Sequence, residues 1–562
     1  MDRRTLLAIT LSFLLLIVFQ TVSDLYLSPQ QATDQQVQAT DQQAKVTDQQ
    51  AKEANPQPKE SKPIDKAIQE QAGVDAAKPP QAHATTLQEA TTDPREQRFE
   101  FDNGVIAGQI SNLGATLAQA RFLKNFDQLP PEGKPIEFLS PSGNHLFFEE
   151  SGFLGEVGID LPNRKTIWTR VGSGKVGPST PLTLVWENGK GLKFEKTFTF
   201  QSNAYLITTV DRVFNTSDKP VVLFHFAHFA RIEPKPAEHQ AMAPVDYEGP
   251  MGYLDGTRVQ HVYADLKKQD QRVNAQEGWV GFNDKYFLAA IVPEANSGTK
   301  KYYFDFDEPT HRVGLVAGKQ ELQPGGKLEK STRLFVGPKE IRNLEALGLT
   351  LERSLDYGWF HFLAVPLVKI LLFFNDFLHN YGVAIILLTV IIKILFFPLA
   401  TKSYRSMNAM KKLAPKMEEI KKLYAHDKAM MQQETMRMYQ ENKVNPLGGC
   451  LPIVVQIPVF FALYKVLFLS VEMRQAPLFL WIHDLSVMDP YYVLPVLMGI
   501  SMFIQTKMNP APADPVQAKV MLFLPVVFTF MFLSFPAGLV LYWLVNNVLS
   551  ISQQGYIMKM EK

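Results

Sequence analysis

The sequence has 562 residues, of which 57 are Lys or Arg and 56 are Asp or Glu, so its formal net charge is +1. This balance excludes a small basic nucleic-acid-binding protein. The single cysteine, Cys450, excludes an intramolecular disulfide, and it has no metal-ligating neighbours in sequence. We therefore expect no metal site and no cofactor.

The amino-terminal residues form an apolar run, Thr5 to Val22, preceded by Arg3 and Arg4. No small-residue cleavage site follows this run, which favours an uncleaved anchor over a signal peptide. We expect residues 1–26 to be a transmembrane signal anchor with the amino terminus in the cytoplasm.

Residues 27–98 contain no aromatic residue and carry the repeat ATDQQVQ, ATDQQAK, VTDQQAK from Ala32. The period of seven suggests a coiled coil, but no apolar seam accompanies it. Gln, Asp, Thr and Pro cannot bury enough surface to offset chain entropy. We expect a disordered periplasmic tether.

Residues 99–350 change to period-two patterns such as Lys193–Phe200, separated by turn dipeptides such as Asn188-Gly189. These signals predict a large antiparallel all-β domain of the sandwich type. His225 and His228 lie in one apolar strand, where a spacing of three places them on opposite faces. We favour a structural role for both over a catalytic one.

From residue 358 the sequence is typical of a membrane protein. Residues 358–378 are aromatic-rich but interrupted by Pro366, Lys369 and Asp376, which predicts an amphipathic helix lying in the interface. Five apolar segments of membrane length follow, of which the last three are short, about 15 or 16 residues each. These candidate spans are residues 380–400, 450–470, 491–506, 520–535 and 537–552.

The loops orient these spans. Ten Lys and Arg lie in 401–445 but only Arg474 in 471–490, so the first loop is expected in the cytoplasm and the second outside. With the anchor, the sequence predicts an α-helical polytopic membrane protein with six transmembrane helices. Both termini then lie in the cytoplasm, and the β domain lies outside.

Lys393 lies within an otherwise apolar span. A charge at this depth costs roughly 2.5 to 3.5 kcal/mol, so it is rarely kept without a use. A lysine that extends its ammonium to the headgroups is one interpretation. Because no predicted span contains an Asp or Glu to pair with Lys393, we prefer a hydrated intramembrane cavity. Other spans add polar groups, including Gln456, Asn546 and Asn547.

Residues 401–445 predict two amphipathic helices that break near His426-Asp427, with methionines embedded among lysines. Methionine forms adaptable apolar surface, so these side chains suit contact with varied partners, although packing within the hairpin is equally expected. The basic charge suits ribosomal RNA or anionic lipid. The candidate contact residues are Met407, Met410, Met417, Met430 and Met431.

Three segments of the carboxyl-terminal part resemble the YidC family of bacterial membrane protein insertases. They are Asn445–Pro452 (NPLGGCLP), Val471–Pro477 (VEMRQAP) and Phe535–Tyr542 (FPAGLVLY). The resemblance covers 358–562 closely. Less specifically, 99–350 resemble the mutarotase-like periplasmic β-sandwich of Gram-negative members.

The resemblance implies a five-helix insertase core, residues 379–562, in the bacterial inner membrane. It implies insertion and folding of nascent membrane proteins, alone or with the Sec translocon, with the ribosome, the signal recognition machinery and the phospholipid bilayer as further partners. It implies no enzymatic activity and no catalytic residue.

The family's hydrated groove carries one positive residue, usually arginine, where this sequence has Lys393. The family's threonine is present as Thr389, and a tyrosine that contacts nascent chains in some members is Trp543 here. We expect the substrate groove to include Lys393, Thr389, Gln456, Tyr542 and Trp543.

Two other functions compete with this one. A secondary transporter using Lys393 in a polar cavity predicts inverted repeats and paired intramembrane ionisable groups, and neither is evident. A membrane-tethered sugar-processing enzyme predicts a carboxylate and histidine constellation in the β domain. The sequence lacks G-x-x-x-x-G-K-[ST], so partitioning and membrane potential must drive insertion.

Overall fold

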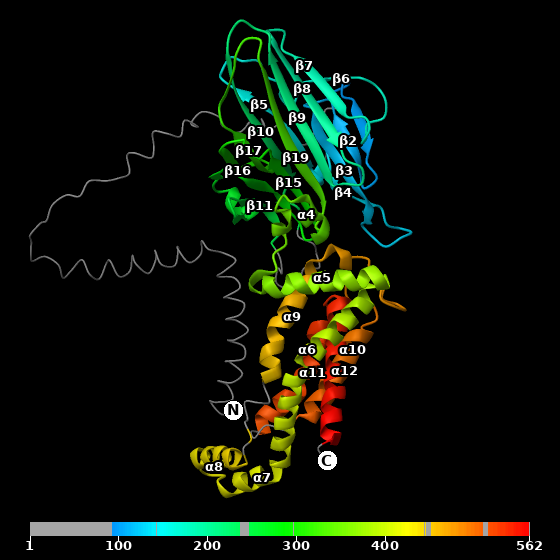
Figure 1. Cartoon of the computed structure of the whole chain (residues 1–562), viewed down its shortest axis with the longest axis vertical. Helices are drawn as coiled ribbons and strands as arrows, with labels where there is room; N and C mark the ends of the chain where they lie inside the picture. The colour runs from blue at the N-terminus through cyan, green and yellow to red at the C-terminus, as the bar shows by residue number, and fades with distance from the viewer. Residues whose placement is uncertain are drawn as a thin grey trace, which may run out of the picture. The chain divides into compact units, whose positions relative to one another are not determined.

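The computed structural model describes residues 93–560 apart from 142, 236–246, 296, 443, 445–450 and 510–514. The expected anchor, nearly all of the expected tether, Cys450 and most of the NPLGGCLP segment therefore lie outside the described residues. The described chain begins with strands and ends with helices (Figure 1).

The strands form two antiparallel sheets, which confirms the predicted all-β sandwich. The ten-stranded sheet has the order β1-β2-β3-β5-β10-β17-β16-β13, with β4 on β3 and β18 on β10. Its strands are β1 (Arg98–Asp102), β2 (Ile106–Ser111), β3 (Thr116–Phe126), β4 (Pro135–Leu139), β5 (Phe147–Gly155), β10 (Val221–Ile232), β13 (Gln271–Ala275), β16 (Lys300–Asp307), β17 (Thr310–Ala317) and β18 (Gln320–Leu322).

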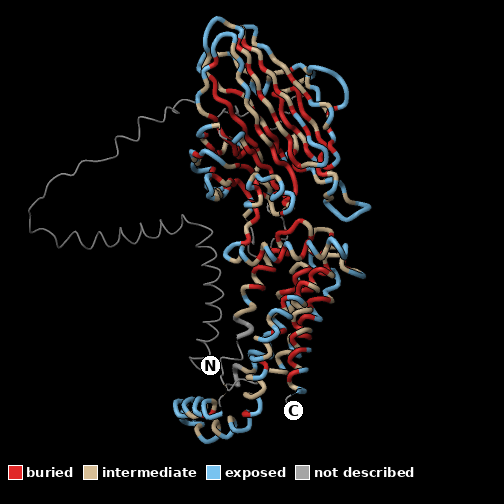
Figure 2. Tube along the Cα trace, viewed as in Figure 1, coloured by how far each residue is buried: buried red, intermediate tan, exposed pale blue. Residues whose placement is uncertain are grey.

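The nine-stranded sheet has the order β12-β11-β14-β15-β19-β9-β8-β7-β6. Figure 2 shows buried residues along the strands of the sandwich. The strands of this sheet are β6 (Thr169–Val171), β7 (Leu182–Glu187), β8 (Leu192–Phe200), β9 (Leu206–Asn215), β11 (Gly249–Leu254), β12 (Thr257–Gln260), β14 (Gly278–Asn283), β15 (Phe287–Pro293) and β19 (Lys327–Pro338).

The alternation of buried residues and the residue types at the turns explain why this part of the sequence forms strands joined by tight turns. Asp255 and Gly256 connect β11 to β12 with φ of 45° and 81°, the positive values that a two-residue hairpin turn requires. Along β8 every second residue is buried, as the period-two pattern predicts. One buried position, Lys196, is a charged residue, and it begins a polar network inside the sandwich.

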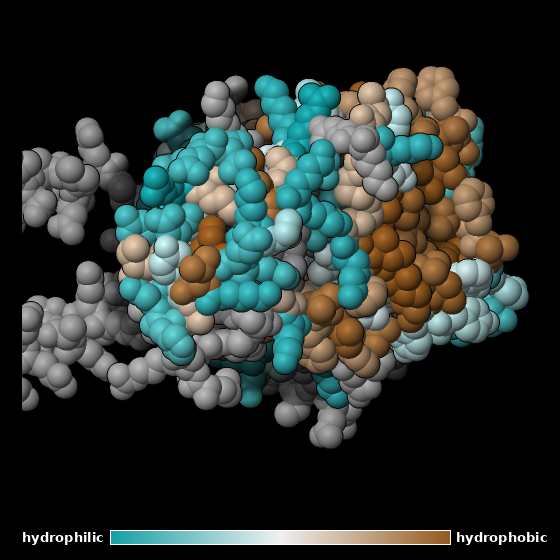
Figure 3. Space-filling view, turned by 90° about the horizontal axis from the view of Figure 1, so that it is seen from below, coloured by the Kyte–Doolittle hydropathy of each residue, from teal (hydrophilic) through white to brown (hydrophobic). Residues whose placement is uncertain are grey.

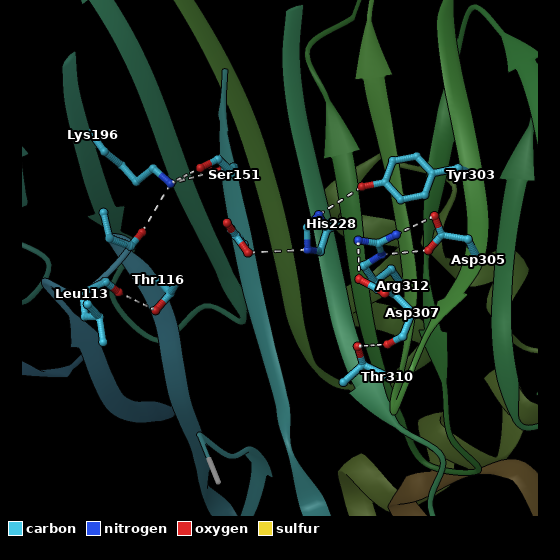
Figure 4. A network of polar contacts seen from close by, with 12 residues as sticks. Leu113, Thr116, Ser151, Lys196, His228, Tyr303, Asp305, Asp307, Thr310 and Arg312 are labelled. Atoms are coloured by element: carbon cyan, nitrogen blue, oxygen red, sulfur yellow. Dashed lines mark hydrogen bonds and ion pairs between the residues drawn. The ribbon is translucent and has the colours of Figure 1, made fainter. Parts of the chain in front are cut away.

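Lys196 is held between the sheets by oxygen atoms. Its Nζ donates to the Ser151 carbonyl at 2.6 Å and to Ser151 Oγ at 3.1 Å (Figure 4). It also lies 3.6 Å from Asp211 Oδ1. Asp211 Oδ2 in turn lies 2.9 Å from His225 Nε2. The fully buried Glu149 is close to this group, and burial raises its pKa to about 7 although Lys196 acts in the opposite direction.

His228 belongs to a separate buried group on the other face of β10. Its Nδ1 lies 3.0 Å from the Tyr303 hydroxyl and its Nε2 lies 3.7 Å from Glu150 Oε2. Burial holds the pKa of His228 well below its usual value. The expectation that His225 and His228 occupy opposite faces is therefore confirmed, and Figure 4 shows His228 among Tyr303 and Arg312.

All the described helices except η1 and α3 follow the last strand. The short ones are η1 (Gly143–His145), α3 (Tyr263–Leu266), α4 (Ile341–Leu347), η2 (Leu351–Ser354), η3 (Gly358–Phe360) and η5 (Val471–Met473). The longer ones are α5 (His361–Leu378), α6 (Tyr381–Lys412), α7 (Ala414–Leu423), α8 (Lys428–Glu441), α9 (Leu451–Leu469), α10 (Val493–Met508), α11 (Pro515–Phe532) and α12 (Ala537–Met560).

Two described segments, Gly358–Leu378 and Tyr381–Lys412, are long and apolar enough to cross a membrane. Shorter apolar helical segments are Val455–Leu469, Val493–Met508 and Ala518–Phe532. The count of six spans thus stays a prediction. Figure 1 shows α5 lying crosswise to α6 and α9, both of which it contacts, an orientation suited to an interfacial helix.

The helices that contain the last two predicted spans are longer than those spans, although the apolar segment of the first, Ala518–Phe532, is as short as expected. α11 has 18 residues, and α12 has 24 and continues to Met560. At 1.5 Å per residue, α12 reaches about 36 Å, which exceeds the hydrocarbon thickness. The helix continues past its apolar part because Gln553 and Gln554 find partners: Gln553 Nε2 bonds the Phe397 carbonyl and Gln554 Nε2 bonds Asn509 Oδ1.

The expected hairpin also differs in one respect. Its first half is continuous with α6 as far as Lys412, and a new helix, α7, begins after Leu413 because Pro415 lacks a backbone N–H to continue the ladder. The predicted break near His426-Asp427 is confirmed. Asp427 caps α8 by accepting hydrogen bonds from the backbone N–H groups of Ala429 and Met430.

The buried Glu149 yields a pH prediction. Its pKa is higher in the folded state, about 7, than its ordinary value of 4.5, so the folded chain binds this proton more tightly than the unfolded chain does. The Glu149 contribution to the free energy of unfolding should therefore fall, by the order of 2 to 3 kcal/mol, as pH rises from about 4.5 to 7.

Glu149→Gln should remove this fall. The measurement is guanidinium unfolding of a soluble fragment, residues 93–357, at several pH values, followed by the fluorescence of tryptophans that include the buried Trp279. The matched control is Glu187→Gln, which changes an exposed carboxyl in β7. If the stability of Glu149→Gln and of the unchanged fragment differ by the same amount at every pH, the assignment to Glu149 is wrong.

Candidate functional site

The ammonium of Lys393 is directed to a neighbouring helix. Lys393 is half-buried on α6, and its Nζ donates a hydrogen bond of 2.7 Å to Ser550 Oγ on α12. The partner is a neutral hydroxyl, which orients the charge without neutralising it. A lysine held in this way between two helices differs from one that extends freely to the headgroups.

A chain of polar groups continues from Ser550. Ser550 Oγ donates to the Asn546 carbonyl at 2.8 Å, and Asn546 Oδ1 accepts a hydrogen bond from Gln456 Nε2 of α9. On the same helix, Asn547 Nδ2 donates to Ser501 Oγ of α10 at 3.0 Å. Polar side chains of α12 therefore bond to α6, α9 and α10, as expected where water is scarce.

Thr389 lies one turn from Lys393 but is used differently. It is buried, and its Oγ1 donates to the Ile385 carbonyl of its own helix at 2.7 Å. This hydroxyl is thus engaged within α6, a common arrangement for threonine in an apolar helix. That Thr389 and Lys393 belong to one polar strip therefore stays a prediction, which rests on their spacing along the helix.

Tyr542 and Trp543 lie in an aromatic cluster of α9, α11 and α12. The Trp543 ring centroid is 4.7 Å from that of Phe460 and 5.3 Å from that of Phe532. Tyr542 is fully buried, whereas Trp543 is half-buried. Trp543 is therefore the more accessible of the two to a passing segment.

The sequence analysis missed Ser550 and did not assign Asn546 to the site. A signal was present, since Asn546, Ser550 and Gln553 recur at helical spacing along α12. Gln553 Nε2 also lies 3.2 Å from Thr401 Oγ1, so the polar face of α12 extends along α6 beyond Lys393.

The hairpin methionines fall into two groups. The Tyr439 hydroxyl of α8 lies 3.7 Å from Met417 Sδ of α7, so Met417 packs within the hairpin. Met407, Met410 and Met431 are half-buried, while Met430 is 39% exposed. Of the five candidate contact residues, Met417 therefore packs within the hairpin and Met430 is the most exposed.

The outer faces of the helices are strongly apolar. Figure 3 shows hydrophobic side chains gathered on one part of the lower face, beside a hydrophilic part. Exposed apolar area this large marks contact with lipid or another protein. The exposed side chains include Ile391, Ile394, Leu395 and Phe397 of α6, Val496, Leu497, Ile500, Phe503 and Ile504 of α10, and Phe523, Val527 and Phe530 of α11.

The β domain contains the histidine and carboxylate groups that a sugar-processing enzyme would need, but they are enclosed. Tyr303 and His228 are at most 3% exposed and bond to each other. The nearby Arg312 is 5% exposed and pairs with Asp305 at 2.8 Å. These four side chains satisfy one another, as expected of groups that build structure.

Comparison with known proteins identifies the family. A model described as 60Kd inner membrane protein matches residues 373–562, and one described as YidC periplasmic domain matches residues 98–370. The membrane protein insertase YidC of Magnetococcus marinus is 52% identical over 566 residues, covering 100% of this chain and 99% of its own length. The chain belongs to the YidC family.

A further relative agrees with this assignment, and two solved structures are similar over part of the chain. The YidC insertase of Polynucleobacter asymbioticus is 40% identical, covering 82% of this chain and 84% of its own. A crystal structure titled active YidC insertase covers 80% of this chain and 90% of its own, at 19% identity and a TM-score of 0.36. A galactose mutarotase related enzyme from Lactobacillus acidophilus covers 43% of this chain and 97% of its own, at 13% identity and a TM-score of 0.30.

The bond between Lys393 and Ser550 makes a testable prediction. Ser550→Ala should lower the free energy of unfolding by about 1 kcal/mol, because the buried ammonium loses its hydrogen-bond acceptor. The measurement is unfolding of the full chain in mixed micelles by increasing sodium dodecyl sulfate.

Two further variants isolate the pair. Ser552→Ala removes an exposed hydroxyl that bonds only within α12, to the Val548 carbonyl, and should have almost no effect. Combining Ser550→Ala with Lys393→Met completes a double-mutant cycle. A coupling energy of zero would contradict the proposed orientation of Lys393 by Ser550.

Proposed function

We propose that this chain inserts and folds nascent proteins in the bacterial inner membrane, as its relatives' name, membrane protein insertase, implies. The observation that carries the mechanism is the Lys393 ammonium, held by a neutral hydroxyl within an apolar helix. A cation that has no internal counter-charge as its hydrogen-bond partner remains available to attract an acidic or polar segment.

The mechanism has three steps. The cytoplasmic hairpin, with exposed Met430, first receives the nascent segment. The hydrophilic flank then enters a hydrated groove lined by Lys393, Gln456 and Trp543, attracted by the positive charge. The apolar part leaves across the exposed apolar faces of α6 and α10 into lipid, which supplies the free energy of the reaction.

The remaining parts of the proposal follow the sequence analysis. Six membrane-spanning helices, including residues 1–26, place both termini in the cytoplasm and the β domain in the periplasm. Helix α5 lies in the interface. The Sec translocon, the ribosome and the signal recognition machinery are the expected partners, and the chain is not an enzyme.

The first prediction concerns the charge. Lys393→Glu should abolish insertion of single-span substrates with acidic tails, because the groove would then repel the segment that it must admit. The measurement is protease protection of such a substrate in cells depleted of the endogenous insertase. Lys393→Arg, the matched control, keeps the charge and should retain activity. Normal insertion by Lys393→Glu would refute the charge mechanism.

The second prediction separates insertase from enzyme. Deleting residues 99–340 removes the sandwich but keeps α4, whose Glu345 and Arg342 pair with Lys369 and Asp376 of α5. Most insertion activity should survive in the same protease-protection assay. Complete loss of activity, with the shortened chain present in the membrane at normal amount, would favour a function located in the β domain.

A further inference from the structure

A cavity of about 380 Å³ lies between β3, α4, α5, the start of α6 and the segment that follows α9. This volume falls in the range of small-ligand sites. Its walls carry two carboxylates, Glu340 and Glu472, and two guanidinium groups, Arg342 and Arg474. Nothing in the insertion mechanism uses this site.

The acceptor side of the cavity suits a cation. Asn125 Oδ1 is buried and has no hydrogen-bond partner among the described residues. Burial, together with the nearby Glu340 carboxyl, raises the pKa of Glu472 to about 7. Burial likewise raises the pKa of Glu340. A bound ligand with several N–H donors would stabilise the two partly buried carboxyls and the unsatisfied amide oxygen together.

The donor side suits an anion. The two guanidinium nitrogens of Arg342 are engaged by Asp376 at 2.9 and 2.8 Å, so this arginine is already paired. Arg474 makes one weaker contact, from Nη2 to the Asp127 carbonyl at 3.2 Å. Burial lowers the pKa of Arg474, a penalty that a bound anion would relieve.

Exposed apolar side chains occur on α5 and in the segment after Arg474, two parts of the chain that contribute to the cavity wall. On α5, which contributes Leu372 to the wall, Phe373 and Phe377 are 53% and 69% exposed. In the segment after Arg474, Phe479 and Leu480 are 58% and 80% exposed. Aromatic and aliphatic groups exposed beside charged ones are typical of a membrane–water interface.

We propose that this cavity binds the headgroup of a zwitterionic phospholipid of the phosphoethanolamine class. The primary ammonium lies between Glu340, Glu472 and Asn125 Oδ1, and the phosphate lies against Arg474. A quaternary ammonium has no N–H to donate, and a glycerol headgroup has no positive charge, so both bind more weakly. The site rests on its own residues and is independent of the insertion mechanism.

The experiment is lipid titration of the full chain in detergent, read by native mass spectrometry. Dioleoylphosphatidylethanolamine should bind about tenfold more tightly than the phosphatidylcholine or phosphatidylglycerol with the same chains, as one charge-assisted hydrogen bond implies. Glu472→Gln should remove this preference while leaving phosphatidylglycerol binding unchanged. Arg474→Gln removes the partner of the phosphate, which the three lipids share, and should weaken the binding of all three.

Two further variants secure the result. Glu132→Gln removes an exposed carboxyl between β3 and β4, outside the cavity, and should bind like the unchanged chain. If Glu472→Gln does not elute as a single folded species, Asn125→Leu decides in its place. Equal binding of the three lipids, an unchanged preference in Glu472→Gln, or unchanged binding of all three lipids by Arg474→Gln overturns the proposal. So does equally tight binding of soluble phosphoethanolamine, because the ligand would then not be a lipid.

Discussion

The arrangement of the helical part depends on the cost of keeping one ammonium in an apolar environment. A charge within a membrane-length helix costs a few kcal/mol. Among the described residues, Lys393 has a hydrogen bond to a hydroxyl and no ion pair with a carboxylate. Ser550 accepts from Lys393, and the same polar face of α12 reaches Gln456 on α9. A carboxylate at position 550 would neutralise the charge and remove its use. The Ser550 hydroxyl orients the Lys393 ammonium and leaves its charge available to attract an acidic segment.

In the β domain, by contrast, a buried ammonium is paired with a carboxylate. Lys196 is also a buried ammonium, but there a carboxylate lies 3.6 Å away and a backbone carbonyl 2.6 Å away. The buried charged side chains of the sandwich therefore pair with one another, as expected in a structural domain. Within its described residues, the helical part pairs its cation only with a hydroxyl, as the proposed substrate groove requires.

The link between the two parts is itself charged. Arg342 and Glu345 of α4 pair with α5, and Gln475 Nε2 donates to the Phe126 carbonyl of β3 at 2.9 Å. Exposed ion pairs of this kind add little to the free energy of unfolding. Their main effect is therefore to orient α4 and α5 relative to each other. The cavity that we propose as a headgroup site is lined by these same elements, which connect the sandwich to the helices near the proposed lipid surface.

The sequence by itself determined the division into a β sandwich and apolar helices, because periods of two and long apolar runs are local properties. It also determined the hairpin break at Asp427, a local capping signal, and the presence of a cation at Lys393. It could not determine which polar groups meet, since that depends on the rotation of packed helices. Only the tertiary structure brought Ser550 to Lys393, turned the Thr389 hydroxyl back to its own helix and extended α12 to Met560.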